Sequence, residues 1–402
     1  MTATLRPGAP HEAGMRSERV QHARELCARW VGEGHTPALS VCVARRGVIV
    51  LHEAWGVQGP EAGAAPITRD SIFPIMSVTK PLTATLVMQL VDDGMLGLNR
   101  PVVDYVPEVT GEGVGEILVH HLLTHTSGYP CDLLPPFISH GAKKMRAGFE
   151  PPPCPAWRHP ELHRRLSLFW DTPREAAPGE VMIYSNHNYR LLGEIVCRLT
   201  QRPLDDFARE RLFGPLGMGS SSYVVPASDV QRVVRRASGL MLTDPIPSML
   251  WDGIDAPRFM ANPDPGGGVF STPGDMAVFG QMILNRGRYG DARILSPAAV
   301  AAMTRNQIPG IRARLVNYEA EHASWGYGWA VASPTKWKYF DGSLQPLGTL
   351  GHPGAAGAMM WIDREHELVG AYFEVTTRLT EGLEQVWNFD LFQNAITAAV
   401  EN

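Results

Sequence analysis

The feature that most constrains the fold is a β-strand pattern at both ends of the chain, with a largely helical pattern between them. Near the N-terminus, "ALSVCVARRGVIVLHEAWG" forms two β-rich runs around Arg46-Gly47, a pair typical of a hairpin turn. From about residue 325 the β character returns in "GYGWAVA", in "KWKYFDG" and in residues 349–375. The simplest arrangement is one sheet built from both ends of the chain.

We therefore predict an α/β plus all-α fold, in which an antiparallel sheet flanked by helices carries an inserted, mostly helical lobe. The sheet domain would comprise residues 1–76 and 311–402, and the helical domain residues 77–310. Helical periodicity is clearest in 81–96 and 275–287, and we also predict helices over 17–33 and 381–400. Residues 129–180 are rich in proline and poor in periodic runs, and we predict an ordered, lid-like loop there.

Composition excludes several classes of protein. The 402 residues are 44% hydrophobic, enough for a sizeable core, and the net charge is −5. No basic patch runs through the chain, so we expect no nucleic-acid partner. The apolar runs are far shorter than the roughly 20 residues of a membrane helix, so we expect no membrane partner. The first residues do not resemble a secretory signal, and five scattered cysteines without a CxxC fit a cytoplasmic protein.

A serine and a lysine three positions apart, Ser77 and Lys80, stand directly before a long apolar run. Pro81 lacks an N–H and is tolerated only in the first turn of a helix, so the spacing places Ser77 at the start of a helix that runs to about Met95. Residues i and i+3 share a helical face, which brings Ser77 Oγ within reach of Lys80 Nζ. A lysine whose pKa is lowered by burial can take the serine proton. A capping serine beside a solvated lysine is the alternative interpretation.

A Tyr-x-Asn pattern, Tyr184 and Asn186, precedes another apolar helix. A phenol near a lysine ammonium sheds its proton more easily and can carry it to a leaving group. The amide of Asn186 offers a donor and an acceptor, enough to fix both Lys80 and a substrate carbonyl. A turn followed by a helix cap is the structural alternative.

The stretch "LGHPGAAG", residues 350–357, is the third element. Pro353 suits an edge strand, and the small residues after His352 let a substrate lie close against that strand. We expect Gly354 at this edge, and the N–H of Ala355 to form an oxyanion hole together with the N–H of Ser77. A glycine-rich turn between strands is the structural alternative.

Three motifs in this order resemble the serine β-lactamase and penicillin-binding-protein superfamily, most closely its class C β-lactamase-like esterase and acyltransferase branch: Ser77-x-x-Lys80, Tyr184-x-Asn186 and His352-x-Gly354. The stretches "LLTHTSG", "GGGVFSTPGDMAVF" and "WGYGW" are also similar to that branch. The resemblance spans residues 20 to 400, with the proline-rich segment as the least similar part. It implies that Ser77 is the acylated nucleophile, Lys80 its base and Tyr184 the base of the second step.

One departure from the superfamily bears on the substrate. The third motif of true β-lactamases is Lys-Thr-Gly, and here it reads His-Pro-Gly. The lysine and the threonine that would hold a substrate carboxylate are both replaced, which favours esters. We predict a serine esterase that acts on a small-molecule ester or acyl substrate. The alternatives are an acyltransferase of secondary-metabolite biosynthesis, a β-lactamase or D-amino-acid peptidase, and a non-catalytic binding protein on the same fold.

We predict no cofactor and no metal. His121 and His125 have the i, i+4 spacing of metal ligands, but no glutamate follows His121 and no third ligand is evident. Six aromatic residues either line an acyl pocket or pack in the core: Tyr129, Trp157, Phe169, Trp170, Trp325 and Tyr327. The oligomeric state, and whether Cys131 and Cys154 are close, stay open.

Overall fold

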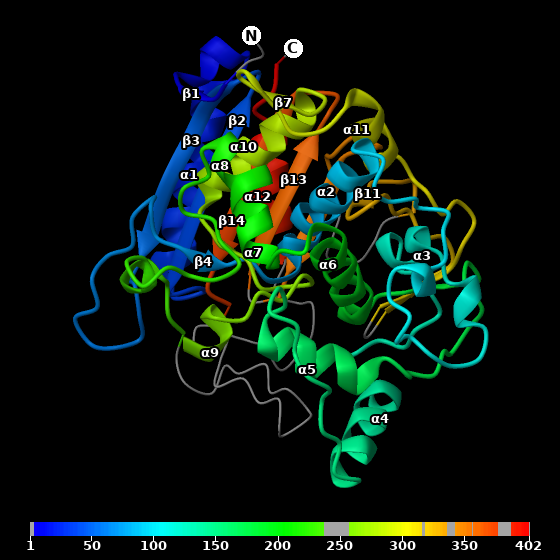
Figure 1. Ribbon diagram of the computed structural model, residues 1–402. Helices are drawn as coiled ribbons and strands as arrows, with labels where there is room; N and C mark the ends of the chain where they lie inside the picture. The colour runs from blue at the N-terminus through cyan, green and yellow to red at the C-terminus, as the bar shows by residue number, and fades with distance from the viewer. Residues whose placement is uncertain are drawn as a thin grey trace.

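A seven-stranded sheet is built from both ends of the chain (Figure 1). The computed structural model describes residues 4–236, 257–315, 318–335, 342–355, 357–376 and 387–401. The strand order is β1-β3-β2-β14-β13-β12-β11. The strands are β1 (Arg6–Pro7), β2 (Ala38–Arg45), β3 (Val48–Gly56), β11 (Ala330–Val331), β12 (Leu350–Gly354), β13 (Ala358–Asp363) and β14 (Leu368–Glu374). The predicted fold class is confirmed.

The pairing of the strands departs from the prediction at one edge. β1 runs parallel to β3, whereas the other neighbouring strands of this sheet are antiparallel. The chain passes through a helix and through β2 before it reaches β3, so a parallel return is possible. The predicted hairpin between β2 and β3 is confirmed, with Arg46 and Gly47 both in the left-handed region that tight hairpin turns require, at φ 51° and 79°.

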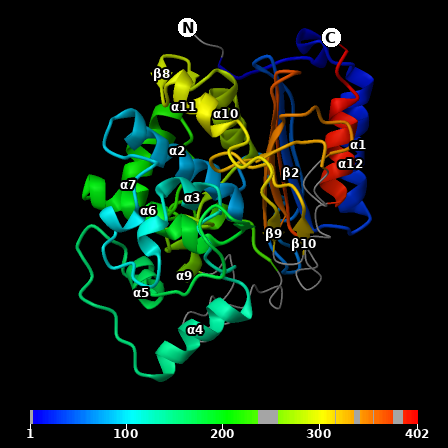
Figure 2. The same ribbon diagram turned by 90° about the vertical axis from the view of Figure 1, so that its right-hand side faces the viewer.

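Helices cover both faces of the sheet (Figure 2). On one face lie α1 (Ser17–Gly32) and α12 (Trp387–Thr397), the first and last helices of the chain. There Trp361 of β13 contacts Phe389 and Phe392 of α12, with ring centroids 5.3 and 6.1 Å apart. On the other face α10 (Pro273–Leu284) packs against β14, and the rest of the helical region lies on this side of the sheet. The central strands β2, β14 and β13 are therefore buried on both sides.

The middle of the chain is mostly helical, as predicted. Its other helices are α2 (Thr79–Asp92), α3 (Val119–Leu123), α4 (Pro135–Arg146), α5 (Pro160–Phe169), α6 (Asn186–Thr200), α7 (Leu204–Ala208), α8 (Gly214–Leu216), α9 (Pro257–Met260) and α11 (Pro297–Met303). Short strands pair within it: β4 (Phe73–Pro74) with β6 (Phe270–Ser271), β7 (Arg288–Tyr289) with β8 (Ala292–Arg293), and β9 (Ala313–Leu315) with β5 (Met182–Ile183) and β10 (Tyr318–Ala320). Domain boundaries at residues 76 and 310 stay a prediction.

The prediction of a loop over 129–180 is wrong, because α4 and α5 lie within it. Pro135 and Pro160 occupy the first positions of these helices, where a proline loses no hydrogen bond. Two other predicted segments fall partly outside the described residues: residues 336–341 of "KWKYFDG", and residues 381–386 of the last helix. In the described part of the chain, no helix is both long enough and apolar enough to cross a membrane.

Gly370 of β14 tests the packing of the sheet against α12. A Cβ added at this glycine would lie 1.9–2.3 Å from three ring atoms of Trp361. We expect Gly370→Ala to lower the free energy of unfolding by about 2 kcal/mol, because the ring cannot move without disturbing α12. The matched control is Gly115→Ala, where an added Cβ meets nothing within 4 Å. Urea unfolding measures both variants, and equal midpoints would contradict this packing.

Candidate functional site

Ser77 lies just ahead of α2, in a 3-10 turn formed by Met76–Val78. The helix itself begins two residues later, at Thr79, so the prediction that Ser77 is its first residue is wrong. The helix ends at Asp92 rather than near Met95. Met76 has φ 47°, in the left-handed region that costs free energy for a residue with a side chain. Ser77 is half-buried in this turn, whereas the flanking residues Met76 and Val78 are buried.

Lys80 is completely buried in the first turn of α2, and its Nζ contacts three oxygen atoms. Nζ lies 2.9 Å from Ser77 Oγ, 2.6 Å from Asn186 Oδ1 and 2.7 Å from the carbonyl oxygen of Gly266. The ammonium can donate to all three acceptors. The neutral amine has only two protons, and the amide and carbonyl oxygens can only accept. Its lone pair therefore faces Ser77, which is the geometry of a base beside a nucleophile.

The pKa of Lys80 suits this role. Burial lowers the pKa to about 7, and the charges of Asp132 and Asp264 counteract part of this effect. Near neutral pH a large fraction of the lysine is thus the free amine. The sequence-based expectation that burial would make Lys80 a base is supported by this environment.

Tyr184 directly follows β5 and faces the same amine. Lys80 Nζ lies 4.7 Å from the centroid of the Tyr184 ring, and the imidazole of His125 packs on the ring at a centroid distance of 4.5 Å. Burial raises the pKa of the Tyr184 phenol well above its usual value, although a hydrogen bond with Ser77 works in the opposite direction. The expectation that this phenol loses its proton easily is therefore wrong, since at neutral pH it is a proton donor.

Asn186, the first residue of α6, is fixed from both sides. Its Oδ1 accepts from Lys80, while its Nδ2 and its backbone N–H donate to Asp132 at 3.3 and 2.8 Å. Because a carboxylate only accepts, the amide nitrogen must face Asp132 and the amide oxygen must face Lys80. The predicted contact between Asn186 and Lys80 is present, and the assumed contact with a substrate carbonyl stays a prediction.

The strand β12 closes the other side of the site, next to the turn that holds Ser77. Among the described residues β11 pairs only with the first two residues of β12, and there the prediction of an edge strand holds from His352 onward. A Cβ at Gly354 would lie 2.2 Å from the carbonyl oxygen of Ile75, so only glycine allows this close approach. Ala355 is exposed in the turn that follows Gly354, and its part in an oxyanion hole stays a prediction.

His352 is fully buried on β12 beside Tyr184, with ring centroids 6.3 Å apart. Burial lowers the pKa of this imidazole to about 3, with the Lys80 charge acting in the same direction. Its Nδ1 lies 2.8 Å from the carbonyl oxygen of Pro353, an acceptor, so the proton of the neutral ring sits on Nδ1. Its Nε2 is buried and has no hydrogen-bond partner among the described residues.

Three charged residues at this site were missed by the sequence analysis: Asp132, Arg190 and Asp264. Arg190 lies on α6 and bonds Asp132 at 2.9 Å and Asp264 at 2.8 Å, with all three side chains buried. A charged residue inside the apolar run "NYRLLGEIV" was the available signal, because an unpaired charge is rarely buried. Its partners come from distant segments that no local pattern identifies.

The remaining sequence-based candidates lie elsewhere or act as packing. His125 lies beyond the end of α3 with φ 58°, so the helical i, i+4 spacing with His121 does not apply. In the described ranges, no group of three histidine, cysteine, aspartate or glutamate residues is placed to hold a metal ion. The five cysteines are free, with Cys131 buried and Cys154 exposed. Of the six aromatic residues, Trp325 reaches the site and contacts the Tyr184 ring at a centroid distance of 6.1 Å.

The comparison with protein families decides the ancestry of this arrangement. The pattern of the family described as Beta-lactamase matches residues 18–388. The chain belongs to the beta-lactamase family. "Penicillin-binding protein 4" of Amycolatopsis lactamdurans is 33% identical to it over 81% of this chain and 76% of its own length. The chain is thus a serine hydrolase of the β-lactamase and penicillin-binding-protein superfamily, as the motifs predicted.

Two solved structures of this beta-lactamase fold show the same architecture. A penicillin-binding protein homologue from Caulobacter crescentus aligns with a TM-score of 0.76 at 21% identity, over 96% of this chain and 99% of its own. A family VIII carboxylesterase aligns with a TM-score of 0.70, also at 21% identity, over 96% and 99%. At this identity the likeness establishes the fold alone, and the substrate has to be argued from the site.

Proposed function

We propose that the protein is a serine hydrolase that cleaves carboxylic esters through an acyl intermediate on Ser77. In the resting site the free amine of Lys80 takes the Ser77 proton while Oγ attacks the ester carbonyl. The N–H groups of Ser77 and Ala355 are the proposed donors to the resulting oxyanion. When the carbon–oxygen bond breaks, the alkoxide takes a proton from the Tyr184 phenol, and the Lys80 ammonium returns a proton to that phenol.

The second half of the cycle releases the acid. A water molecule takes the place of the alcohol and gives its proton toward Tyr184 and Lys80 as its oxygen attacks the acyl carbon. The bond between that carbon and Ser77 Oγ then breaks, and the Lys80 ammonium, 2.9 Å from Oγ in the resting site, gives Ser77 its proton. Protons and bonds balance over the two steps, because one water is consumed and one alcohol and one acid are released.

The complete burial of the His352 imidazole is the observation that carries the choice of esters. This residue stands where the β-lactamases of the superfamily have the lysine of Lys-Thr-Gly, and burial lowers its pKa to about 3. An uncharged imidazole gives no ion pair to the carboxylate of a β-lactam or of a peptide C-terminus, and burying an unpaired carboxylate there is costly. A neutral ester carries no such charge.

Three alternatives remain as proposals of lower rank. Acyl transfer uses the same intermediate but places an alcohol or an amine where water attacks. A β-lactamase or D-amino-acid peptidase activity would need another cation for the substrate carboxylate. A non-catalytic binding protein would not need the contact between Lys80 and Ser77, which a buried lysine maintains against its desolvation cost. A cytoplasmic location also stays a prediction.

The proposal is tested by trapping the acyl adduct and locating it by mass spectrometry. After mixing with p-nitrophenyl esters of increasing acyl length and rapid acid quenching, we expect intact mass to rise by one acyl group and peptide mapping to place that group on Ser77. Release of p-nitrophenol should follow with a burst. Parallel samples with benzylpenicillin and with a D-alanyl-D-alanine peptide should form far less adduct. An adduct from penicillin alone would overturn the ester assignment, and added amines or alcohols that become acylated would favour the transferase.

A further inference from the structure

Arg190 joins two buried carboxylates that come from distant parts of the chain. Its Nη1 donates to Asp132 Oδ2 at 2.9 Å, and its Nε donates to Asp264 Oδ2 at 2.8 Å. Asp132 follows α3, Arg190 lies on α6, and Asp264 precedes β6. The three residues are 2–5% exposed, so these contacts are largely shielded from solvent.

The other oxygen of each carboxylate holds a group that contacts Lys80. Asp132 Oδ1 accepts the backbone N–H of Asn186 at 2.8 Å, and Asp264 Oδ1 accepts the N–H of Gly266 at 2.8 Å. Asn186 Oδ1 and the Gly266 carbonyl in turn accept from Lys80 Nζ. The hydrogen bonds therefore close a ring that passes once through Lys80 and once through Arg190.

We infer that Arg190 is a positioning residue that orients the amine of Lys80, the base of the reaction, toward Ser77. This inference rests on the proposed function, since it concerns the same serine and lysine. By fixing both carboxylates, Arg190 fixes the two oxygen atoms that take the protons of the neutral amine. The lone pair of Lys80 then faces Ser77 Oγ, 2.9 Å away. Without this ring the amine would rotate among several acceptors, and proton transfer from Ser77 would lose its alignment.

The charges of the ring also modify the proton affinity of Lys80, which burial lowers most. Arg190 with two carboxylates has one net negative charge, which favours the ammonium form. Burial would raise the pKa of Asp132, but Arg190 and Arg165 outweigh it and lower that pKa to about 2, so this carboxylate stays ionised. Around Lys80 the charged groups are Asp132, Asp264 and Arg190, and Arg165 acts on both carboxylates. The uncharged groups around Lys80 are Cys131, His125, His352, Tyr184 and Tyr189.

The test measures how fast Ser77 reacts with a fluorophosphonate at different pH values. In this reaction Ser77 Oγ forms a bond to phosphorus, fluoride leaves, and Lys80 takes the proton, so the rate should rise with pH around a midpoint near 7. We expect Arg190→Met to slow the reaction about 10- to 100-fold and to move the midpoint upward, since a cation is lost. Asp132→Asn should move the midpoint downward, because an anion is lost. Arg190→Lys should keep the midpoint but not restore the full rate.

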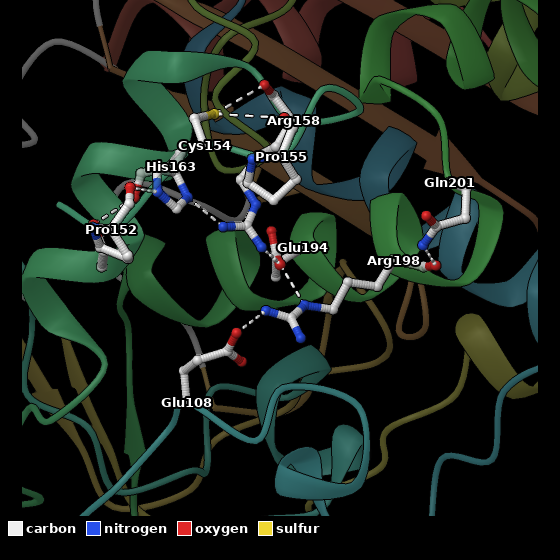
Figure 3. Close-up of polar contacts among 10 residues, drawn as sticks. Glu108, Pro152, Cys154, Pro155, Arg158, His163, Glu194, Arg198 and Gln201 are labelled. Carbon is white, nitrogen blue, oxygen red and sulfur yellow. Dashed lines mark hydrogen bonds and ion pairs between the residues drawn. The ribbon is translucent and has the colours of Figure 1, made fainter.

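A second buried arginine provides the matched control (Figure 3). Arg158 is 4% exposed. It contacts Glu194, which lies on α6 like Arg190, and His163 of α5. Arg198 completes this cluster at Glu194, and no hydrogen bond or ion pair between the described residues links it to Asp132 or Asp264. Arg158→Met should lower the melting temperature as Arg190→Met does but leave the pH midpoint unchanged.

The outcomes separate the two proposals. If wild-type Ser77 is neither phosphonylated nor acylated, the proposed function fails. The inference fails if wild type reacts but Arg190→Met keeps the wild-type midpoint and loses no more rate than Arg158→Met does. Arg190 would then have a structural role only. Should Arg190→Met not fold, Asp132→Asn and Arg190→Lys decide the question. A lower midpoint in Asp132→Asn, together with a reduced rate at an unchanged midpoint in Arg190→Lys, supports the ring. A wild-type midpoint in Asp132→Asn together with the wild-type rate in Arg190→Lys overturns it.

Discussion

Replacing Ser77 by alanine is expected to lower ester hydrolysis by about 10³-fold or more and to abolish the acyl adduct. The hydroxyl oxygen is the atom that bonds to the acyl group, so neither Lys80 nor Tyr184 can compensate for its loss. The fold should be retained, because Ser77 lies in a partly exposed turn and its removal takes one hydrogen bond from Lys80. The measurement is the initial rate with p-nitrophenyl esters, together with intact mass.

A substitution at a second serine, Ser40, is the control for a general effect of losing a serine hydroxyl. Ser40 is completely buried on β2, and its Oγ donates to the carbonyl oxygen of Glu53 at 3.3 Å. Ser40→Ala should lose about 1 kcal/mol of stability but keep its activity. If Ser77→Ala retained more than a tenth of the wild-type rate, the nucleophile would have to be sought elsewhere in the chain.

Local patterns in the sequence were enough to place the longer strands of the main sheet and the main motifs of the site. The hairpin at Arg46-Gly47 follows from residues that accept positive φ between two apolar runs. The contact between Ser77 and Lys80 follows from a spacing of three at the beginning of a helix. Even the 3-10 turn at Ser77, which the sequence did not reveal, leaves these two side chains within 2.9 Å.

The features that sequence did not provide depend on partners far away in the chain. Asp132 is 58 residues from Arg190, and Arg190 is 74 residues from Asp264, and nothing in the periodicity links them. The helices α4 and α5 were missed for a different reason. Their prolines were taken as loop signals, although a proline at the first position of a helix is favourable. The raised pKa of Tyr184 also depends on tertiary burial.

Replacing Lys80 by methionine is expected to slow acylation of Ser77 by about 10³-fold, because the base is lost while the apolar stem is kept. The rate that remains should no longer rise with pH around 7, since the group that titrates there is gone. The matched control is Lys144→Met, which removes a lysine paired with Asp171 on the surface and should change neither the rate nor its pH dependence. A Lys80→Met variant with the wild-type midpoint would assign the titration to another group.

The same substitution should change how stability depends on pH, which tests the state of Lys80 without any substrate. The folded pKa of about 7 lies below the ordinary value of 10.5. Between these values the unfolded lysine holds a proton that the folded one does not, so the contribution of Lys80 to stability rises with pH and is lost as pH falls toward 7. The difference in unfolding free energy between wild type and Lys80→Met should therefore grow by up to ~4 kcal/mol from pH 7 to 10. Urea unfolding at both pH values measures it, and other titrating groups cancel in the difference. A difference that does not change with pH would mean that Lys80 keeps its proton in the folded protein, and the amine could then not serve as the base.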